Sequence, residues 1–244
     1  MSHHLVAARD LGFTYPDGQA ALEGVSFTIH HGESVAVIGG NGAGKSTLLL
    51  HLNGVLTPHR GELRIGDFPI TRENLTEVRR TVGMIFQEAD NQLFMPTVFD
   101  DVAFGLSHQG LAADDVEVRV MQALETVGAA HLRVRPPYRL SGGEKRAVAI
   151  AGVLVTQPSI LVMDEPSSGL DPAARRRLIR LLAGFDHTKI IATHDLDLVL
   201  DLCSRVLVMN RGRIEADGLP SEVFADTSLL ERCNLEAPPS YQRR

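Results

Sequence analysis

Residues 34–47 read SVAVIGGNGAGKST, a short apolar run followed by a glycine-rich turn. Residues 39–46 fit the pattern G-x-x-x-x-G-K-[ST], and a helical pattern begins at Lys45. A glycine-rich turn between a strand and a helix lets backbone N–H groups converge on phosphate oxygens, and the helix N-terminus adds partial positive charge. The stretch therefore predicts a phosphate-binding loop at the end of a buried strand.

Apolar runs of the same kind recur along the chain. ILVMD at 160–164 and KIIAT at 189–193 are continuous apolar runs, which are typical of strands buried on both faces of a parallel sheet. Strand patterns cover Leu5–Tyr15, Val25–Ile29, Ser34–Ile38, Glu62–Ile65, Val82–Phe86, Ile160–Met163, Lys189–Thr193 and Arg205–Met209. Helical patterns cover Lys45–Asn53, Asp115–Val127, Gly142–Val155, Ala173–Ala183 and Leu196–Cys203. The alternation of the two predicts an α/β fold with a doubly wound core.

Two regions depart from this alternation. The first, up to about Ile29, alternates like an antiparallel sheet with a turn at Pro16–Gly18 and predicts an N-terminal antiparallel β subdomain. The second, about 88–158, carries helical patterns without a central strand and predicts an inserted α-helical subdomain. We expect one domain, built around the phosphate-binding loop, over 5–236 and a short C-terminal tail over 237–244.

Composition excludes several classes of protein. The 244 residues suit one domain with an insertion, and a net charge of −6 without a long basic run argues against binding to nucleic acid. No apolar run reaches the ~18–20 residues that cross a bilayer. Cys203 and Cys233 have no Cys or His at metal-binding spacing and are expected to be reduced thiols.

The phosphate loop assigns roles to its own residues. We expect Lys45 to bind the β- and γ-phosphates, Ser46 to bind Mg²⁺, and Thr47 to contact the α-phosphate. The backbone of the loop is expected to surround the phosphates, and it consists of Gly39, Gly40, Asn41, Gly42, Ala43 and Gly44. The loop thus predicts a nucleoside triphosphate and Mg²⁺ as ligands of this site.

The stretch ILVMDEP supplies two carboxylates at the end of a predicted buried strand. Asp164 comes where the strand would reach the phosphate loop, so it is a candidate Mg²⁺ ligand. Glu165 is the next residue and should point away from Asp164, toward a water molecule. A carboxylate there can act as general base for attack on the γ-phosphate, an effect worth ~10²–10⁴-fold.

LSGGEKR at 140–146 predicts a second anion-binding loop. Ser141 is a good helix N-cap, and Gly142 and Gly143 expose N–H groups at the start of a helical pattern. Only one metal-binding aspartate follows a predicted strand, so this second loop has no metal chemistry of its own. It can bind a phosphate but cannot hydrolyse it alone.

GGNGAGKST, LSGGEKR, ILVMDEPSSGLDP and IIATHD occur in this order and spacing, and together they resemble the ATP-binding cassette (ABC) ATPase family over nearly the whole chain. The resemblance implies a P-loop NTPase (RecA-like) core. It also implies that two subunits pack head to tail, with the signature loop LSGGE of one covering the ATP on the phosphate loop of the other. The partner is then a second copy of the chain or a paralogous ATPase.

The resemblance implies roles for four further residues. Tyr15 matches the aromatic residue that stacks on adenine, and Gln87 matches the residue that links Mg²⁺ and water to the transport partner. Asp171 matches the loop that crosses the dimer interface, and His194 matches the histidine that reaches the γ-phosphate. Glu165, His194 and Gln87 are therefore the predicted catalytic residues.

Two residues depart from the family pattern. Glu144 replaces the commonest glutamine of the signature loop, and Gly40 stands where proline is frequent. Neither change removes a backbone group that contacts phosphate, so we expect both half-sites to be active.

FQEADNQLFMPTVFDDVAFGL, together with the signature region, resembles the ATPases of energy-coupling-factor importers, most closely the cobalt type. This implies integral-membrane coupling and substrate-binding partners, and a peripheral location on the cytoplasmic face of the cell membrane. Nickel or a vitamin stays open as the transported substrate, and a soluble ABC ATPase is the alternative function. The apolar cluster Leu93–Met95 either receives a helix of the partner or packs internally.

Rival classes lack support in the sequence. A DNA-repair ATPase of this family needs a long coiled-coil insertion between Gln87 and the signature loop, where only about fifty residues lie. A P-loop kinase or GTPase would lack LSGGE, and a non-enzymatic regulator would be expected to lose Glu165 or His194.

Overall fold

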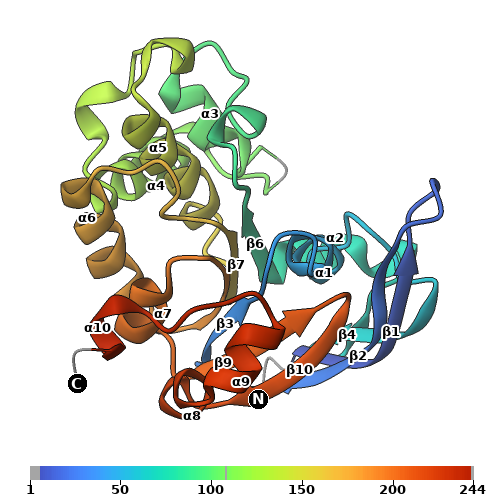
Figure 1. The fold of residues 1–244 in the computed structure, drawn as a ribbon. Helices are drawn as coiled ribbons and strands as arrows, with labels where there is room; N and C mark the ends of the chain where they lie inside the picture. The colour runs from blue at the N-terminus through green and yellow to red at the C-terminus, as the bar shows by residue number, and fades with distance from the viewer. Residues whose placement is uncertain (1–5, 108, 243–244) are drawn as a thin grey trace. The chain divides into compact units, whose positions relative to one another are not determined.

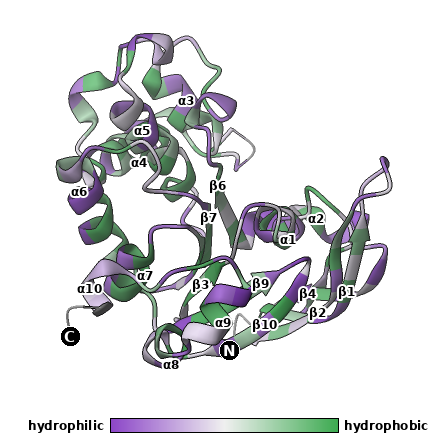
Figure 2. Cartoon of the chain, viewed as in Figure 1, coloured by the Kyte–Doolittle hydropathy of each residue, from purple (hydrophilic) through white to green (hydrophobic). Residues whose placement is uncertain are grey.

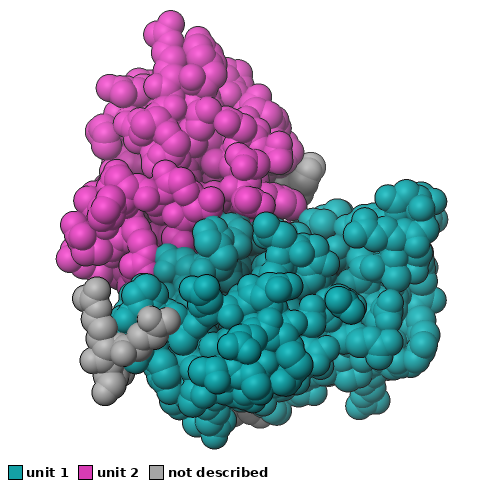
Figure 3. Space-filling view, in the orientation of Figure 1, with its two compact units in different colours: residues 1–82, 159–165, 186–244 teal, residues 83–158, 166–185 magenta. Residues whose placement is uncertain are grey.

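The computed structural model describes residues 6–107 and 109–242 (Figure 1). Leu5 and the last two residues of the predicted tail therefore lie outside the described residues. The chain forms two compact units, coloured separately in Figure 3. Unit 1 comprises 1–82, 159–165 and 186–244, and unit 2 comprises 83–158 and 166–185. The predicted inserted segment 88–158 belongs to unit 2, together with 166–185.

An antiparallel sheet of four strands forms the N-terminal part of unit 1. Its strands are β1 (Val6–Thr14), β2 (Ala20–Ile29), β4 (Arg60–Ile65) and β5 (Phe68–Pro69), in the order β2-β1-β4-β5. Val6, Ala8, Leu11 and Phe13 are buried on β1, as expected of a strand with one face on a core. The turn between β1 and β2 is closed by the Gly18 N–H donating to the Tyr15 carbonyl (2.9 Å). The antiparallel subdomain predicted up to Ile29 thus also contains β4 and β5.

A mostly parallel sheet forms the rest of unit 1. Its strands are β3 (Ser34–Ile38), β7 (Ile160–Asp164), β8 (Thr188–Ala192), β9 (Arg205–Asn210) and β10 (Arg213–Gly218), in the order β10-β9-β3-β8-β7. β3 runs parallel to β8 and β9, β7 runs parallel to β8, and only β10 is antiparallel to its neighbour. All of β7 and β8 is buried, and β3, β7 and β9 are largely green in Figure 2. This arrangement confirms the predicted α/β core, and it brings the carboxyl ends of β3, β7 and β8 to one edge.

The helices of unit 1 lie between these strands in the sequence or follow the last strand, β10. They are α1 (Lys45–Leu52), α2 (Leu75–Thr81), α7 (Leu196–Leu202), α8 (Pro220–Ala225), α9 (Thr227–Arg232) and α10 (Pro239–Gln242), with a 3-10 turn at Arg72–Asn74. Leu48, Leu49 and Leu52 of α1 are fully buried, so packing of its apolar side chains holds the phosphate-loop helix in place.

Unit 2 begins within the short strand β6 (Val82–Ile85), because Val82 is counted in unit 1 and Gly83 in unit 2. The rest of unit 2 is helical. Its helices are α3 (Val98–Phe104), α4 (Ala113–Thr126), α5 (Gly142–Leu154) and α6 (Pro172–Ala183), with 3-10 turns at Ala89–Asn91, Ala130–Leu132 and Pro137–Arg139. Val98, Val102, Val120, Leu124 and Val148 belong to the apolar core that α3, α4 and α5 share. Among the described residues, none forms a helix with the length and apolar character that crossing a membrane requires.

Candidate nucleotide site

The phosphate loop follows β3 directly and ends in α1. Gly39 approaches the end of β9 so closely that a Cβ there would lie 2.2 Å from the Met209 carbonyl oxygen. Gly44 has φ of 101°, and a Cβ there would lie 2.5 Å from the Ala21 carbonyl oxygen. Only glycine fits these two positions. No side chain of the described residues caps α1, so its first N–H groups remain available to an anion.

Lys45 folds back onto its own loop. Its Nζ donates to the carbonyl oxygens of Gly39 (2.8 Å) and Gly40 (3.1 Å). Burial lowers the pKa of Lys45, and the nearby carboxylates Glu165 and Asp164 partly offset this shift. The structure therefore brings the phosphate loop and both predicted carboxylates into one electrostatic site.

Tyr15 and Thr47 lie together at the start of α1. The Tyr15 hydroxyl and Thr47 Oγ1 are 3.0 Å apart and share a hydrogen bond, and Phe13 packs edge-on against the Tyr15 ring. Thr47 is buried, whereas Ser46 is exposed in the same turn. Tyr15, the predicted adenine-stacking residue, is thus adjacent to Thr47, the predicted contact of the α-phosphate.

The chemistry of Asp164 and Ser46 fits Mg²⁺. Asp164 ends β7 and is buried, and Ser46 follows Lys45 in the first turn of α1. A carboxylate and a hydroxyl are the oxygen donors that Mg²⁺ accepts beside nucleotide phosphates. These two residues would hold the ion, which would neutralise developing charge on the phosphates.

Glu165 and His194 form a pair. Glu165 is buried, has φ of 46°, and accepts on Oε2 a 2.7 Å contact from His194 Nδ1. The same oxygen accepts hydrogen bonds from Thr193 Oγ1 and from the His194 N–H, both at 3.2 Å. The His194 side chain is 72% exposed, so the imidazole joins a buried carboxylate to solvent.

Thr193 is a site residue that sequence reasoning missed. Its side chain is fully buried and its hydroxyl donates to Glu165 while accepting from the Asp195 N–H (3.0 Å). It therefore fixes the orientation of the Glu165 carboxylate. Its place in IIATHD, directly after a buried strand and before the predicted histidine, was the available signal.

The signature loop is closed by a capping box. Ser141 Oγ accepts from the Glu144 N–H (3.4 Å), and Glu144 Oε2 accepts from the Ser141 N–H (2.7 Å) and hydroxyl (2.8 Å). These hydrogen bonds from Ser141 lower the pKa of Glu144. The unusual glutamate thus stabilises the loop conformation, which the spacing S-x-x-E could have indicated. A Cβ added at Gly142 would meet no atom of the described residues within 4 Å, so the face of the loop at this residue is open.

Gln87 is exposed. Its backbone is held by α5, which begins in the signature loop and is called the signature helix below. The Arg146 guanidinium donates to the carbonyl oxygens of Phe86 (2.6 Å) and Gln87. In addition, Lys145 Nζ donates to Asp90 Oδ1 (2.6 Å). Arg146 is 5% exposed and sequence reasoning assigned it no role, because its partners are backbone atoms about sixty residues earlier.

Asp171 caps α6. Its Oδ1 accepts from the N–H groups of Ala173 and Ala174, both at 2.8 Å, and these bonds lower the pKa of Asp171. A Cβ added at Gly143 would lie 3.9 Å from Ala174 and 4.0 Å from Leu170. The signature loop and the Asp171 loop are therefore neighbours on unit 2.

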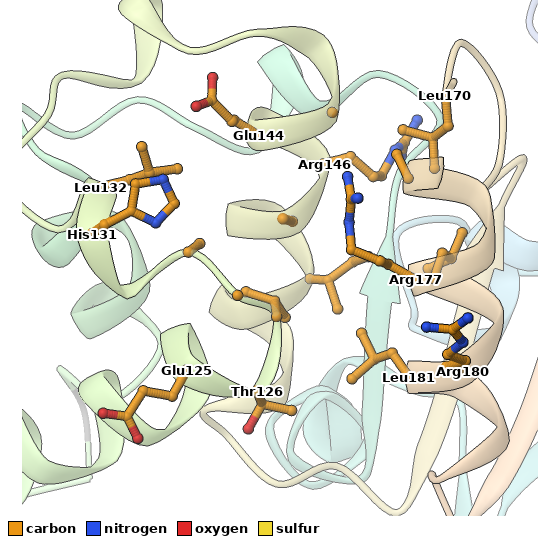
Figure 4. A pocket seen from close by; sticks show the side chains of 18 residues that line it. Glu125, Thr126, His131, Leu132, Glu144, Arg146, Leu170, Arg177, Arg180 and Leu181 are labelled. Carbon is orange, nitrogen blue, oxygen red and sulfur yellow. The ribbon is translucent and has the colours of Figure 1, made fainter. Parts of the chain in front are cut away.

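A cavity of about 670 Å³ lies within unit 2, between the end of α4 and the first turns of α5 and α6 (Figure 4). Leu132, Leu170 and Leu181 contribute apolar lining, and Arg177 and Arg180 contribute charge from α6. Gly143 and Glu144 belong to its wall, so the signature helix is incompletely packed on this side.

Residues 22–168 match the family described as ABC transporter. The chain belongs to the ABC transporter family of ATPases. A putative ABC transporter ATP-binding protein of Geobacter sulfurreducens is 63% identical over 242 residues, covering 99% of this chain and 97% of the relative. The energy-coupling factor transporter ATP-binding protein EcfA of Methanocaldococcus jannaschii is 47% identical over 240 residues, covering 96% and 86%.

Solved structures agree with these relatives. CbiO1 from Clostridium perfringens, part of the ABC transporter complex CbiONQ, has a TM-score of 0.82 and 40% identity, with 99% of this chain and 98% of that chain covered. The ATP-binding cassette MJ0796, a dimer in a post-hydrolysis state with ADP and phosphate, has a TM-score of 0.81 and 26% identity, with 88% and 98% covered. The predicted family, its energy-coupling-factor type and ATP hydrolysis coupled to transport are confirmed.

Proposed function

We propose that the chain powers an importer of energy-coupling-factor type by working as a head-to-tail dimer, with a second copy or a paralogous ATPase. The observation that carries this proposal is the place of the signature loop, which is the second predicted anion-binding loop. The phosphate loop lies beside Lys45, Asp164 and Glu165, whereas the capped signature loop belongs to another unit, beside Asp171. The MJ0796 cassette is dimeric in its solved structure, which supports a dimer.

In such a dimer, each nucleotide site would be formed by residues of both chains. One chain supplies the loop 39–46 and Tyr15 for the nucleotide, with Asp164 and Ser46 for Mg²⁺. Its Glu165 takes a proton from water, and His194 positions that carboxylate and reaches toward the γ-phosphate. The other chain adds the N–H groups of Gly142 and Gly143, so that closure requires the γ-phosphate and opening follows its loss.

Gln87 and the segment after it would connect this site to the membrane partner. Asp101 is buried, and its Oδ1 accepts from the N–H groups of Phe94 (3.0 Å) and Met95 (3.1 Å). The Phe94 side chain is 65% exposed and packs edge-on against Phe104, which is 47% exposed. Leu93, by contrast, packs against the core of unit 2. We propose that Phe94 and Met95, and not Leu93, form the docking surface for the membrane component on the cytoplasmic face.

Phe94→Asp is expected to abolish binding to that component while shifting the melting temperature of the isolated chain only slightly. An exposed side chain contributes little to folding, apart from about 1 kcal/mol of aromatic contact. The measurement is rebinding of the purified chain to membranes from the source cells that have been stripped of endogenous ATPase. Leu93→Asp is the matched control, since it places a carboxylate against the apolar core of unit 2 and should lower the melting temperature much more. Full rebinding of Phe94→Asp would rule out this surface.

Cobalt is the proposed cargo, and the resemblance to CbiO1 of the CbiONQ complex supports it. Nickel and vitamins remain the alternatives, because the ATPase contacts ATP and not cargo. The test is uptake of radiolabelled cobalt by source cells that carry either the wild-type chain or Glu165→Gln. If Glu165→Gln lowers the uptake of nickel or of a vitamin but leaves the uptake of cobalt unchanged, then cobalt is not the cargo. Uptake of all three that is independent of Glu165 would mean that the importer carries another cargo.

A further inference from the structure

Three backbone groups from the C-terminal quarter of the chain lie behind the phosphate loop. The Met209 carbonyl at the end of β9 adjoins Gly39, and the Gly212 N–H donates to the Ala43 carbonyl (3.0 Å). The Cys233 carbonyl adjoins Gly40, where a Cβ would lie 3.4 Å from its oxygen. All these residues belong to unit 1. Met209, Gly212 and Cys233 come after residue 168, where the family match ends.

The Cys233 carbonyl is positioned by the cap that ends α9. The Asn234 N–H donates to the Glu231 carbonyl (3.1 Å), and the Leu235 N–H donates to the Leu230 carbonyl (2.8 Å). This pair of bonds is the Schellman motif, in which the residue directly after the end of the helix takes the left-handed conformation. Asn234 takes that conformation, with φ of 54°. Asparagine and glycine adopt it readily, whereas a β-branched residue does not.

The cap is also tied to the main sheet. Asn210 Nδ2, at the end of β9, donates to the Arg232 carbonyl (3.3 Å). The carbonyl groups of Gly39 and Gly40 in turn accept hydrogen bonds from Lys45 Nζ. A shift of the cap toward or away from Gly40 would therefore move the carbonyl groups that set the position of the phosphate-binding lysine.

We propose that the cap at Leu230–Leu235 is a positioning element of the nucleotide site. It supports the first turn of the phosphate loop at Gly40, and the left-handed conformation of Asn234 sets ATP affinity. Among the described residues, no hydrogen bond or ion pair joins the cap to Glu165 or His194, so we expect the cap to act on binding and not on the chemical step.

Asn234→Val tests the proposal in the isolated full chain. We expect the dissociation constant for trinitrophenyl-ATP with Mg²⁺ to rise about fivefold or more, with KM for ATP rising in parallel and kcat changing less than about twofold. Asn234→Gly keeps the left-handed conformation, and its affinity should stay within about twofold of wild type. Asn210→Ala removes the tie to β9 without straining the backbone and should weaken affinity about twofold to threefold.

Gln157→Val is the matched control for general destabilisation. Gln157 is exposed, left-handed (φ 54°) and lies in unit 2, so the same substitution should lower the melting temperature without changing affinity for the nucleotide. If Asn234→Val binds as tightly as wild type, or if Asn234→Gly loses as much affinity as Asn234→Val, the proposal is wrong. Should Asn234→Val fail to fold, Asn210→Ala decides, and unchanged affinity in that variant overturns the proposal.

Discussion

Glu165→Gln is expected to lower steady-state ATP hydrolysis by ~10²-fold or more, because an amide cannot accept the proton from the attacking water. Nucleotide affinity should change little, since Glu165 bonds to Thr193 and His194 and not to the phosphate loop. The amide oxygen of the substituted side chain can still accept from the Thr193 hydroxyl and the His194 N–H, so folding should also be retained. The measurements are phosphate release at saturating ATP and binding of trinitrophenyl-ATP.

Glu144→Gln is the matched control for that change. It is the same chemical substitution at a residue that stabilises the signature loop, and a glutamine oxygen can still accept from the Ser141 N–H. Hydrolysis by Glu144→Gln should stay within a few-fold of wild type. If Glu165→Gln loses less than about tenfold of the wild-type rate, Glu165 is not the general base.

The sequence predicts those parts of the site that are built from adjacent residues. The strand, turn and helix around Lys45 are contiguous, so SVAVIGGNGAGKST specifies both their order and their glycines. Asp164 ends the buried strand β7, and His194 follows the buried strand β8. Parallel strands bring their carboxyl ends to one edge of a sheet. Local pattern and tertiary structure agree at these positions.

The supporting contacts could not be predicted in the same way. Arg146 bonds to backbone carbonyl groups of Phe86 and Gln87, which carry no side-chain signal. The cap at Asn234 reaches Gly40 across almost two hundred residues, and any residue type can supply a carbonyl group. Sequence patterns identify side-chain chemistry, whereas these contacts depend on where the folded backbone passes.

The cluster Leu93–Met95 illustrates a second limit. Three consecutive apolar residues gave no periodicity by which to separate an internal face from an exposed one. The fold separates them, because the Asp101 carboxylate fixes the backbone at Phe94 and Met95 while Leu93 reaches the core. A cluster that looked uniform in the sequence therefore contains one side chain packed on the core and one that is 65% exposed.

Mixing two inactive variants should restore hydrolysis if the site is shared between chains. Lys45→Ala loses the charge that binds the β- and γ-phosphates but keeps its signature loop. Ser141→Arg loses the hydroxyl bonds of the capping box and obstructs the signature loop, but it keeps its phosphate loop. Each homodimer then has two damaged sites, and each should hydrolyse ATP at a small fraction of the wild-type rate.

A heterodimer of these variants has one site with both defects and one with neither. In an equal mixture with random exchange, half of the dimers are mixed, so recovery should approach about one quarter of the wild-type rate if each site turns over independently. Two different affinity tags allow the heterodimer to be isolated and its phosphate release measured directly. Lys45→Ala mixed with Lys45→Ala,Glu165→Gln is the control, because every site in that mixture lacks the lysine and none should recover. A verified heterodimer of Lys45→Ala and Ser141→Arg that stays as inactive as its parents has two explanations: either the signature loop does not act across the interface, or hydrolysis requires both sites intact. A covalently linked dimer with Ser141→Arg in only one half separates them, because it tests whether one intact site is enough. If this linked dimer is active while the heterodimer is inactive, the cross-subunit assignment is wrong.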